Sequence, residues 1–192
     1  MHIILDELCT NLGMDNILSK EEIAGFQFKA TVLELPANTN LLLSGKQCTK
    51  IWYLFDGVVR MYNKSHRREL TLHLFTNSRF ITDFISVKTK EPTKYNIQTV
   101  IPSTIIEFEA SDLFSFLDTS LNFERVGRKI FETLLLEETA RLQDVLFLDA
   151  TERYKKLWQS KPEYFMQIPQ KYIASYLKIS PETLSRIKKE NL

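Results

Sequence analysis

The spacing of apolar residues changes twice along the chain and divides it into three stretches. Up to about residue 24, leucines recur at helical spacing, as at Leu5, Leu8 and Leu12. Between Phe26 and Phe108, β-branched and aromatic residues form short runs broken by turn residues. After Phe108 the helical spacing returns. The pattern predicts short helices, then an all-β unit, then a helical region.

The middle stretch contains several predicted strands, each bounded by turn residues. The apolar runs are 30–35, 51–55, 58–62, 69–75, 97–101 and 104–108. Asp56-Gly57 lies between two of them, and this dipeptide between apolar runs predicts a hairpin. Many short strands at near-regular spacing favour a rolled or closed sheet. Before the strands, Ser19-Lys-Glu-Glu22 is a capping-box pattern that opens a second helix.

Residues 122–149 are predicted to form one long helix, because they contain no proline and a single glycine, Gly127. Its apolar residues form two stripes, one of Phe131, Leu135, Leu142 and Leu146 and the other of Val126, Ile130, Leu134 and Val145. A helix with two apolar faces needs two partners. A β-unit of about 80 residues is too small to enclose a helix about 40 Å long. We therefore expect one face to pack on the β-unit and the other on a second copy; burial of both faces within one chain is the alternative.

The end of the chain carries the pattern of a helix-turn-helix. A helix predicted over 151–161 stops before Pro162, and two short helices are predicted within 168–190. Ala174 is the small residue where they cross, and Ser180 is the N-cap of the second helix. Lys178 stands where such a turn usually has glycine, so we expect a non-glycine residue with positive φ. Apolar side chains fill the angle between the helices: Ile173, Leu177, Ile179, Leu184 and Ile187. A small helical cap without a partner is the alternative.

The exposed face of the second helix suits DNA. Glu182, Ser185 and Arg186 follow i, i+3, i+4 spacing and share one face. Arginine pairs with guanine and glutamate accepts from cytosine in a major groove. Residues 151–192 hold nine Lys/Arg against four Asp/Glu, which leaves −4 for the first 150 residues at a net charge of +1. The predicted DNA-binding residues are Ser180, Glu182, Thr183, Ser185, Arg186, Lys188 and Lys189.

The composition excludes several classes of site. Cys9 and Cys48 are too few for a disulfide scaffold, a four-cysteine zinc site or a cysteine-only iron–sulfur cluster. We expect no metal and no cofactor. Acidic residues within the first seven positions argue against a signal peptide, and no apolar run approaches the ~20 residues of a membrane span. We therefore expect a soluble, cytoplasmic protein that does not bind a membrane.

In this order of elements the chain resembles the Crp/Fnr family of bacterial regulators. Ser180-Pro-Glu-Thr-Leu-Ser-Arg-Ile is similar to the family's recognition helix, Ser-Arg-Glu-Thr-x-(Ser/Gly)-Arg, with Pro181 in place of an arginine. The segments 43–45 and 54–60 resemble the first glycine turns of its β-roll. Glu182, Ser185 and Arg186 fall on the positions that read bases, and Ser185 is closer to the Fnr branch.

The resemblance implies an α+β fold and a division of the chain. The implied division is an N-terminal double-stranded β-helix (a cyclic-nucleotide-binding-like β-roll) with helices over 1–120, a long dimerisation helix over 121–149 and a helix-turn-helix domain over 150–192. The implied function is a transcription regulator, homodimeric through residues 122–149, that reads a near-palindrome in double-stranded DNA. RNA polymerase is a candidate partner.

The effector pocket departs from the family pattern. The Gly-Glu pair that holds the ribose becomes Thr82 and Asp83, and the phosphate-binding arginine is missing around Thr93 and Lys94. Thr93 does not replace the bidentate fork of arginine, and Lys94 offers only a point charge. We therefore expect a degenerate pocket without tight binding of cyclic AMP, and either an unknown effector or none. Haem would need a histidine such as His66 or His73, but single strand histidines are usually structural.

Two other classes of function are alternatives. A small-molecule-binding module could carry the same helical tail without touching DNA, and a salt series of DNA binding separates the two. An enzyme on a cupin-like barrel would need clustered ligands. The histidines His2, His66 and His73 are scattered, and the sequence holds no P-loop, Gly-x-Ser-x-Gly or His-Glu-x-x-His motif. We expect no enzyme.

Overall fold

The computed structural model describes residues 2–64 and 69–191, so that His66 lies outside the described part. The chain begins with α1 (His2–Asn11), η1 (Met14–Asn16) and α2 (Lys20–Phe28). Eight strands follow: β1 (Thr31–Leu35), β2 (Asn40–Leu42), β3 (Lys50–Asp56), β4 (Val59–Lys64), β5 (Glu69–Phe75), β6 (Arg79–Ile81), β7 (Asn96–Thr99) and β8 (Ser103–Glu109). The remaining helices are α3 (Phe84–Thr89), between β6 and β7, and α4 (Ala110–Thr119), α5 (Leu121–Phe147), α6 (Ala150–Ser160), α7 (Tyr164–Gln167), α8 (Gln170–Tyr176) and α9 (Pro181–Asn191).

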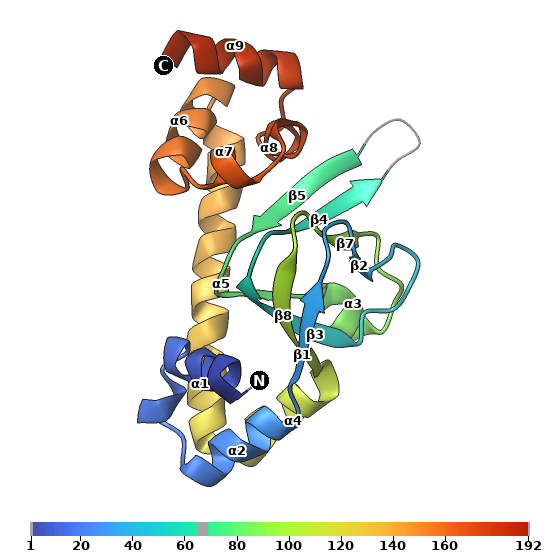
Figure 1. Cartoon of the computed structure of the whole chain (residues 1–192), viewed down its shortest axis with the longest axis vertical. Helices are drawn as coiled ribbons and strands as arrows, with labels where there is room; N and C mark the ends of the chain where they lie inside the picture. Colours follow the sequence, from blue (N-terminus) through green and yellow to red (C-terminus); the bar gives the residue numbers. More distant parts are fainter. Residues whose placement is uncertain (1, 65–68, 192) are drawn as a thin grey trace.

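The strands form two antiparallel sheets that face each other. One sheet has the order β1-β8-β3-β6 and the other β2-β7-β4-β5. Apolar side chains from both sheets fill the space between them, including Trp52, Leu54, Met61, Ile97 and Ile105. This two-sheet roll and the helices at both ends confirm the predicted α+β fold with an N-terminal β-roll, a long helix and a helical tail (Figure 1).

The turn at Asp56-Gly57 does not make the predicted hairpin, and that prediction is wrong. β3 pairs with β6 and β8, whereas β4 pairs with β5 and β7, so the turn carries the chain from one sheet to the other. Gly57 has φ 114°. An added Cβ there would lie 2.2 Å from the hydroxyl oxygen of Ser103, so both the backbone angle and the close packing require glycine.

The N-terminal helices and α4 pack around the first turns of α5. The predicted capping box of α2 is confirmed, since the Ser19 hydroxyl accepts from the Glu22 N–H and the Glu22 carboxylate accepts from the Ser19 N–H. The glycine in α5, Gly127, lies against Leu117 of α4, where a Cβ would be 2.5 Å from the leucine methyl carbon Cδ2. Glycine therefore allows the two helices to approach closely.

The two apolar stripes of α5 have different surroundings. Val126 is 3 % exposed, and Ile130 packs beside it against the cluster that joins the sheet to the N-terminal helices. The first stripe stays largely in solvent, with Leu135 68 %, Leu142 57 % and Leu146 64 % exposed. Val145, from the second stripe, is also 40 % exposed. The chain thus buries the N-terminal part of one face and leaves the other face open.

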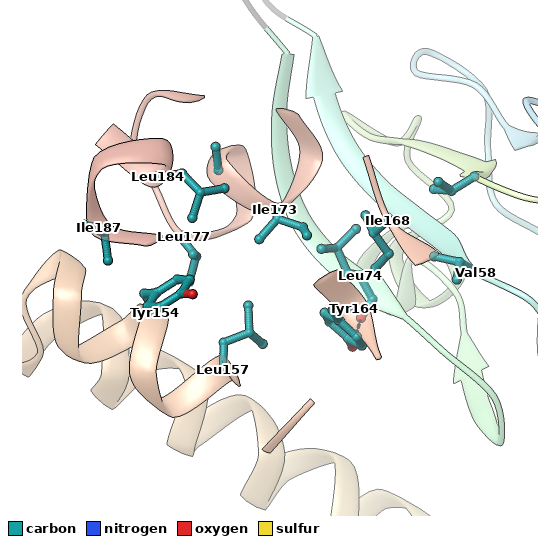
Figure 2. Packing of buried hydrophobic residues seen from close by; sticks show 12 residues of the cluster. Val58, Leu74, Tyr154, Leu157, Tyr164, Ile168, Ile173, Leu177, Leu184 and Ile187 are labelled. Atoms are coloured by element: carbon teal, nitrogen blue, oxygen red, sulfur yellow. Dashed lines mark hydrogen bonds between the residues drawn. The ribbon is translucent and has the colours of Figure 1, made fainter. Parts of the chain in front are cut away.

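The helices of the tail, α6 to α9, lie next to the end of α5 and pack around one buried apolar cluster (Figure 1). Figure 2 shows this core, in which Tyr154 and Leu157 of α6 meet side chains of α8 and α9. Val58 and Leu74 of the β-roll belong to the same cluster, so the tail is packed on the roll. In the described part of the chain, no helix combines the length and apolarity that a membrane span requires.

Candidate nucleic-acid interface

The predicted helix-turn-helix is formed by α8 and α9. Ile173, Ala174 and Leu184 are each fully buried where the two helices meet. The turn between them is closed by two backbone hydrogen bonds, from Lys178 N–H to the Ser175 carbonyl (3.1 Å) and from Ile179 N–H to the Ala174 carbonyl (3.0 Å). These bonds fold the chain back within four residues and fix the crossing of the helices.

The turn requires a left-handed residue, and the expected strain at Lys178 is present. Lys178 has φ 59°, a conformation that costs energy for a residue with a Cβ. Its ammonium group donates to the Thr71 carbonyl at 2.8 Å, which compensates part of that cost. Burial lowers the pKa of Lys178, and Arg141 and Arg153 lower it further. The residue in the usual glycine position therefore has a second role as a contact to the β-roll.

The first turn of α9 is capped as the sequence predicts. The Ser180 hydroxyl accepts from the Thr183 N–H at 3.2 Å, which satisfies one of the free N–H groups at the helix start. Hydrogen bonds from Ser180 and from the Glu182 backbone lower the pKa of the Glu182 carboxyl. Glu182 is therefore ionised at neutral pH, as acceptance of a hydrogen bond from a base requires.

The residues predicted to bind DNA belong to α9 and its N-cap, and α9 lies at one end of the molecule (Figure 1). Five of them are exposed: Ser180, Glu182, Ser185, Arg186 and Lys189. Thr183 and Lys188 are half-buried. Within the described residues, no salt bridge involves Arg186, Lys188 or Lys189. The structure thus leaves the arginine-bearing face accessible.

The tail is attached to strand β5 by polar contacts that the sequence did not reveal. The Thr71 N–H donates to the Ser175 hydroxyl at 2.8 Å, and that hydroxyl donates to the Glu69 carbonyl at 3.3 Å. The Tyr164 hydroxyl donates to the Leu74 carbonyl at 2.8 Å. Helix α8 therefore lies against the free edge of the second sheet and uses backbone groups of β5 that no strand pairs.

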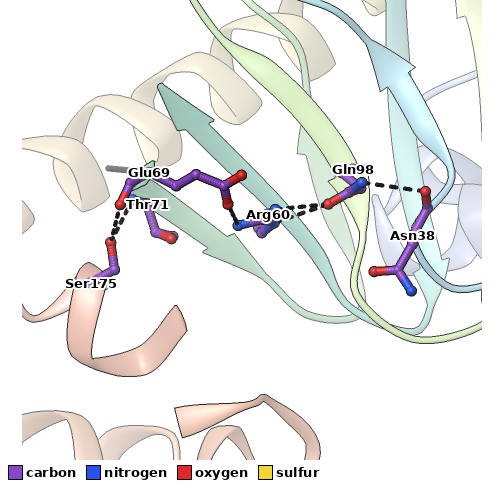
Figure 3. A network of polar contacts seen from close by, with 6 residues as sticks. All are labelled: Asn38, Arg60, Glu69, Thr71, Gln98 and Ser175. Carbon is purple, nitrogen blue, oxygen red and sulfur yellow. Dashed lines mark hydrogen bonds and ion pairs between the residues drawn. The ribbon is translucent and has the colours of Figure 1, made fainter. Parts of the chain in front are cut away.

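Figure 3 shows the charged network behind this contact, centred on Arg60 of β4. Arg60 is 3 % exposed. Its guanidinium donates to Glu69 (2.8 Å) and Gln98 (2.9 Å) and lies 4.0 Å from the ring centre of Tyr172 in α8. A buried arginine with these partners is compensated within the protein. Arg60 therefore connects the two strands that flank β4, namely β5 and β7, to Tyr172 of the helix-turn-helix unit.

The four residues predicted for the effector pocket are only partly brought together. Asp83 and Thr93 are both buried, and the Thr93 hydroxyl donates to the Asp83 carboxylate at 2.5 Å. Asp83 also caps α3 by accepting from the Ser86 N–H at 3.2 Å. Thr82 donates to the Lys50 carbonyl at 2.9 Å, and Lys94 is exposed. Of the four predicted residues, only Asp83 and Thr93 thus bind each other.

No protein-family model and no curated protein sequence matches this chain. Solved structures do match over nearly its full length. The c-di-GMP-responsive global regulator CLP from Xanthomonas campestris is 21 % identical, with a TM-score of 0.68 over 90 % of this chain and 91 % of that one. FixK2 from Bradyrhizobium japonicum reaches 0.72 at 14 % identity, over 84 % of this chain and 83 % of that one.

A protein from Eubacterium rectale described as a transcriptional regulator of the Crp/Fnr family has a TM-score of 0.68 at 14 % identity, over 91 % of this chain and 84 % of that one. This chain has the Crp/Fnr fold. The matches cover 90 % and 91 % of this chain, so the shared fold includes most of its length.

Proposed function

We propose that this chain is a sequence-specific DNA-binding transcription regulator of the Crp/Fnr type. The observation that carries the proposal is the exposed face of α9, where Glu182, Ser185 and Arg186 point away from a buried helix-turn-helix core. A protruding helix with an arginine and a glutamate one turn apart suits the edges of bases in a major groove. The Crp/Fnr fold supports the assignment.

We further propose that residues 122–149 join two copies into a homodimer. The support is the open stripe of α5, in which Leu135, Leu142 and Leu146 remain more than half exposed. Two copies paired along this stripe would place their α9 helices about one DNA turn apart, ~34 Å, and read a near-palindrome. In this proposal residues 1–120 form the sensor domain, residues 121–149 form the dimerisation helix and residues 150–192 form the DNA-binding domain.

The same proposal covers the effector site. Asp83 and Thr93 bind each other, and neither is an arginine that could hold a cyclic phosphate. This supports a degenerate pocket that does not bind cyclic AMP tightly. An occupant of the roll would act on DNA binding by changing the position of the tail on β5.

The proposal is tested by the affinity of the purified chain for duplex DNA, measured by fluorescence anisotropy over a series of salt concentrations. Binding should weaken steeply as salt rises. Arg186→Ala should cost about 1–3 kcal/mol at a selected site and reduce the preference among bases. Lys155→Ala is the matched control, because Lys155 is an exposed cation of α6 and its loss removes the same charge.

The control variant is expected to bind the same sequence with nearly unchanged affinity. Equal losses in the two variants would mean that charge alone, without base recognition at α9, determines binding. If the chain binds no duplex at any salt concentration, the tail is a cap on a small-molecule-binding module and the regulator assignment is wrong.

A further inference from the structure

A cavity of about 600 Å³ lies between α5 and the open side of the β-roll. Its volume is in the range of small-ligand sites. Eight phenylalanines and Tyr95 line it, together with aliphatic side chains of α4 and α5. Its mouth is marked by apolar side chains that stay exposed, such as Ile85 at 66 % and Leu135 at 68 %. The cavity is therefore an apolar chamber that opens beside the proposed dimer face.

Four polar side chains of the wall already have partners in the protein, namely Thr82, Asp83, Glu138 and Arg141. Thr82 donates to the Lys50 carbonyl, and Asp83 accepts from Thr93 and from the Ser86 N–H. At the other end, Arg141 donates to the Glu138 carboxylate at 2.9 Å and to the Leu72 carbonyl at 3.3 Å. A ligand would have to break these bonds to make charged contacts of its own.

The charge of the wall opposes an anion. Its ionisable groups are Asp83, Glu138, Arg141 and His73. Burial and, to a lesser extent, the neighbouring Arg141 together lower the pKa of His73 to about 4, so the imidazole is neutral at pH 7. Two carboxylates then face one guanidinium, which is paired with Glu138. A phosphate or carboxylate would find no uncompensated cation here.

We propose that this cavity binds an uncharged, predominantly apolar small molecule, with aromatic or aliphatic groups that pack among the phenylalanines. Desolvation of such a molecule costs little, and burial of its apolar surface favours binding. A cyclic nucleotide would lose the hydration of its phosphate without a replacement. The effector role of the ligand rests on the proposed function, whereas its binding to the cavity is independent of that function.

Strand β5 gives such a ligand a route to the helix-turn-helix unit. Leu72, His73 and Phe75 line the cavity. In the same strand, the backbone of Thr71 bonds to Ser175 and Lys178 of the tail, and the Leu74 carbonyl accepts from Tyr164. A shift of β5 caused by an occupant would therefore act directly on the contacts that hold α8.

The test is a fluorescence titration of the full chain with N-phenyl-1-naphthylamine, a neutral apolar dye. Saturable binding of one dye per chain is expected. Leu72→Trp fills the cavity from β5 and should weaken dye binding by at least about tenfold. Leu134→Trp fills it from α5 and serves if the first variant fails to fold, which circular dichroism reports. Leu70→Trp is the matched control: it makes the same change two residues earlier, at a 36 % exposed side chain outside the cavity wall.

Cyclic AMP added to the dye complex is expected to leave its fluorescence unchanged. The proposal is overturned if both filling variants bind the dye like the unmodified chain, if no saturable binding occurs, or if cyclic AMP displaces the dye. DNA affinity without dye is measured separately, so loss of dye binding alone leaves the regulator assignment intact.

Discussion

The exposed stripe of α5 leads to a quantitative prediction about assembly. Leu142 is 57 % exposed in the single chain, and full burial of a leucine contributes about 1.5–3 kcal/mol. Burial of the remaining surface would then contribute about 1–1.5 kcal/mol per copy, and twofold symmetry doubles this to about 2–3 kcal/mol. Leu142→Glu removes this contribution and places two carboxylates in an apolar interface, at a further cost.

The dissociation constant of the dimer should therefore rise by at least about 100-fold. Sedimentation equilibrium at several concentrations measures it, since the monomer mass is 22.5 kDa and the dimer has twice that mass. Ala140→Glu is the matched control, because residue 140 is exposed on the opposite side of α5 and receives the same charge. The stripe is not the interface if Leu142→Glu remains as dimeric as the control, or if the unmodified chain is a monomer at every concentration.

Two further predictions concern stability. His73 has a folded-state pKa of about 4 against an ordinary 6.5, so the neutral form is favoured by folding and stability is lost as pH falls from 6.5 to 4. The free energy of unfolding is measured with urea at pH 7 and pH 4. The decrease between the two pH values should be smaller in His73→Gln than in the unmodified chain, by up to about 3 kcal/mol. An equal decrease in both proteins would contradict the assigned cause. Gly57→Ala should destabilise the roll by about 2–4 kcal/mol, because the added Cβ would clash with Ser103. Gly13→Ala should cost only about 1 kcal/mol, because Gly13 has φ 65° but open space around it. Equal decreases in melting temperature for the two variants would refute the steric argument.

Local signals in the sequence were sufficient for much of the fold. The caps at Ser19 and Ser180 depend on residues three positions apart, so the pattern carries the whole interaction. The positive φ of Lys178 also follows from its place in a four-residue turn. The spacing of apolar residues predicted six strands and the long helix for the same reason, because burial of one face imposes the periodicity of the strand or helix on the sequence.

Pairing between distant strands was not predictable in this way. Asp56-Gly57 has the composition of a hairpin turn, yet β3 finds its partners in β6 and β8. The short strands β2 and β6 were missed because three residues are too few to show a period. Turn residues indicate only the local conformation of the backbone. Which strands pair with each other depends on how the whole roll closes.

The candidate site was predictable in part. The exposed positions of α9 follow from helical spacing, since burial of Leu184 and Ile187 places Arg186 outside. The attachment of the tail to the roll did not follow, because Thr71 and Ser175 are 104 residues apart and neither lies in a recognisable motif. The cavity was equally hidden, since its wall combines residues from strands and helices across most of the chain.

The central claim is that α9 reads a base sequence, and its most direct test is selection of bound duplexes from a random pool by the purified protein. We predict enrichment of a near-palindrome whose half-sites are about one helical turn apart, and loss of one defined base preference in each half-site with Arg186→Ala. A pool that stays random, or the same enriched sequence from both proteins, would contradict the claim.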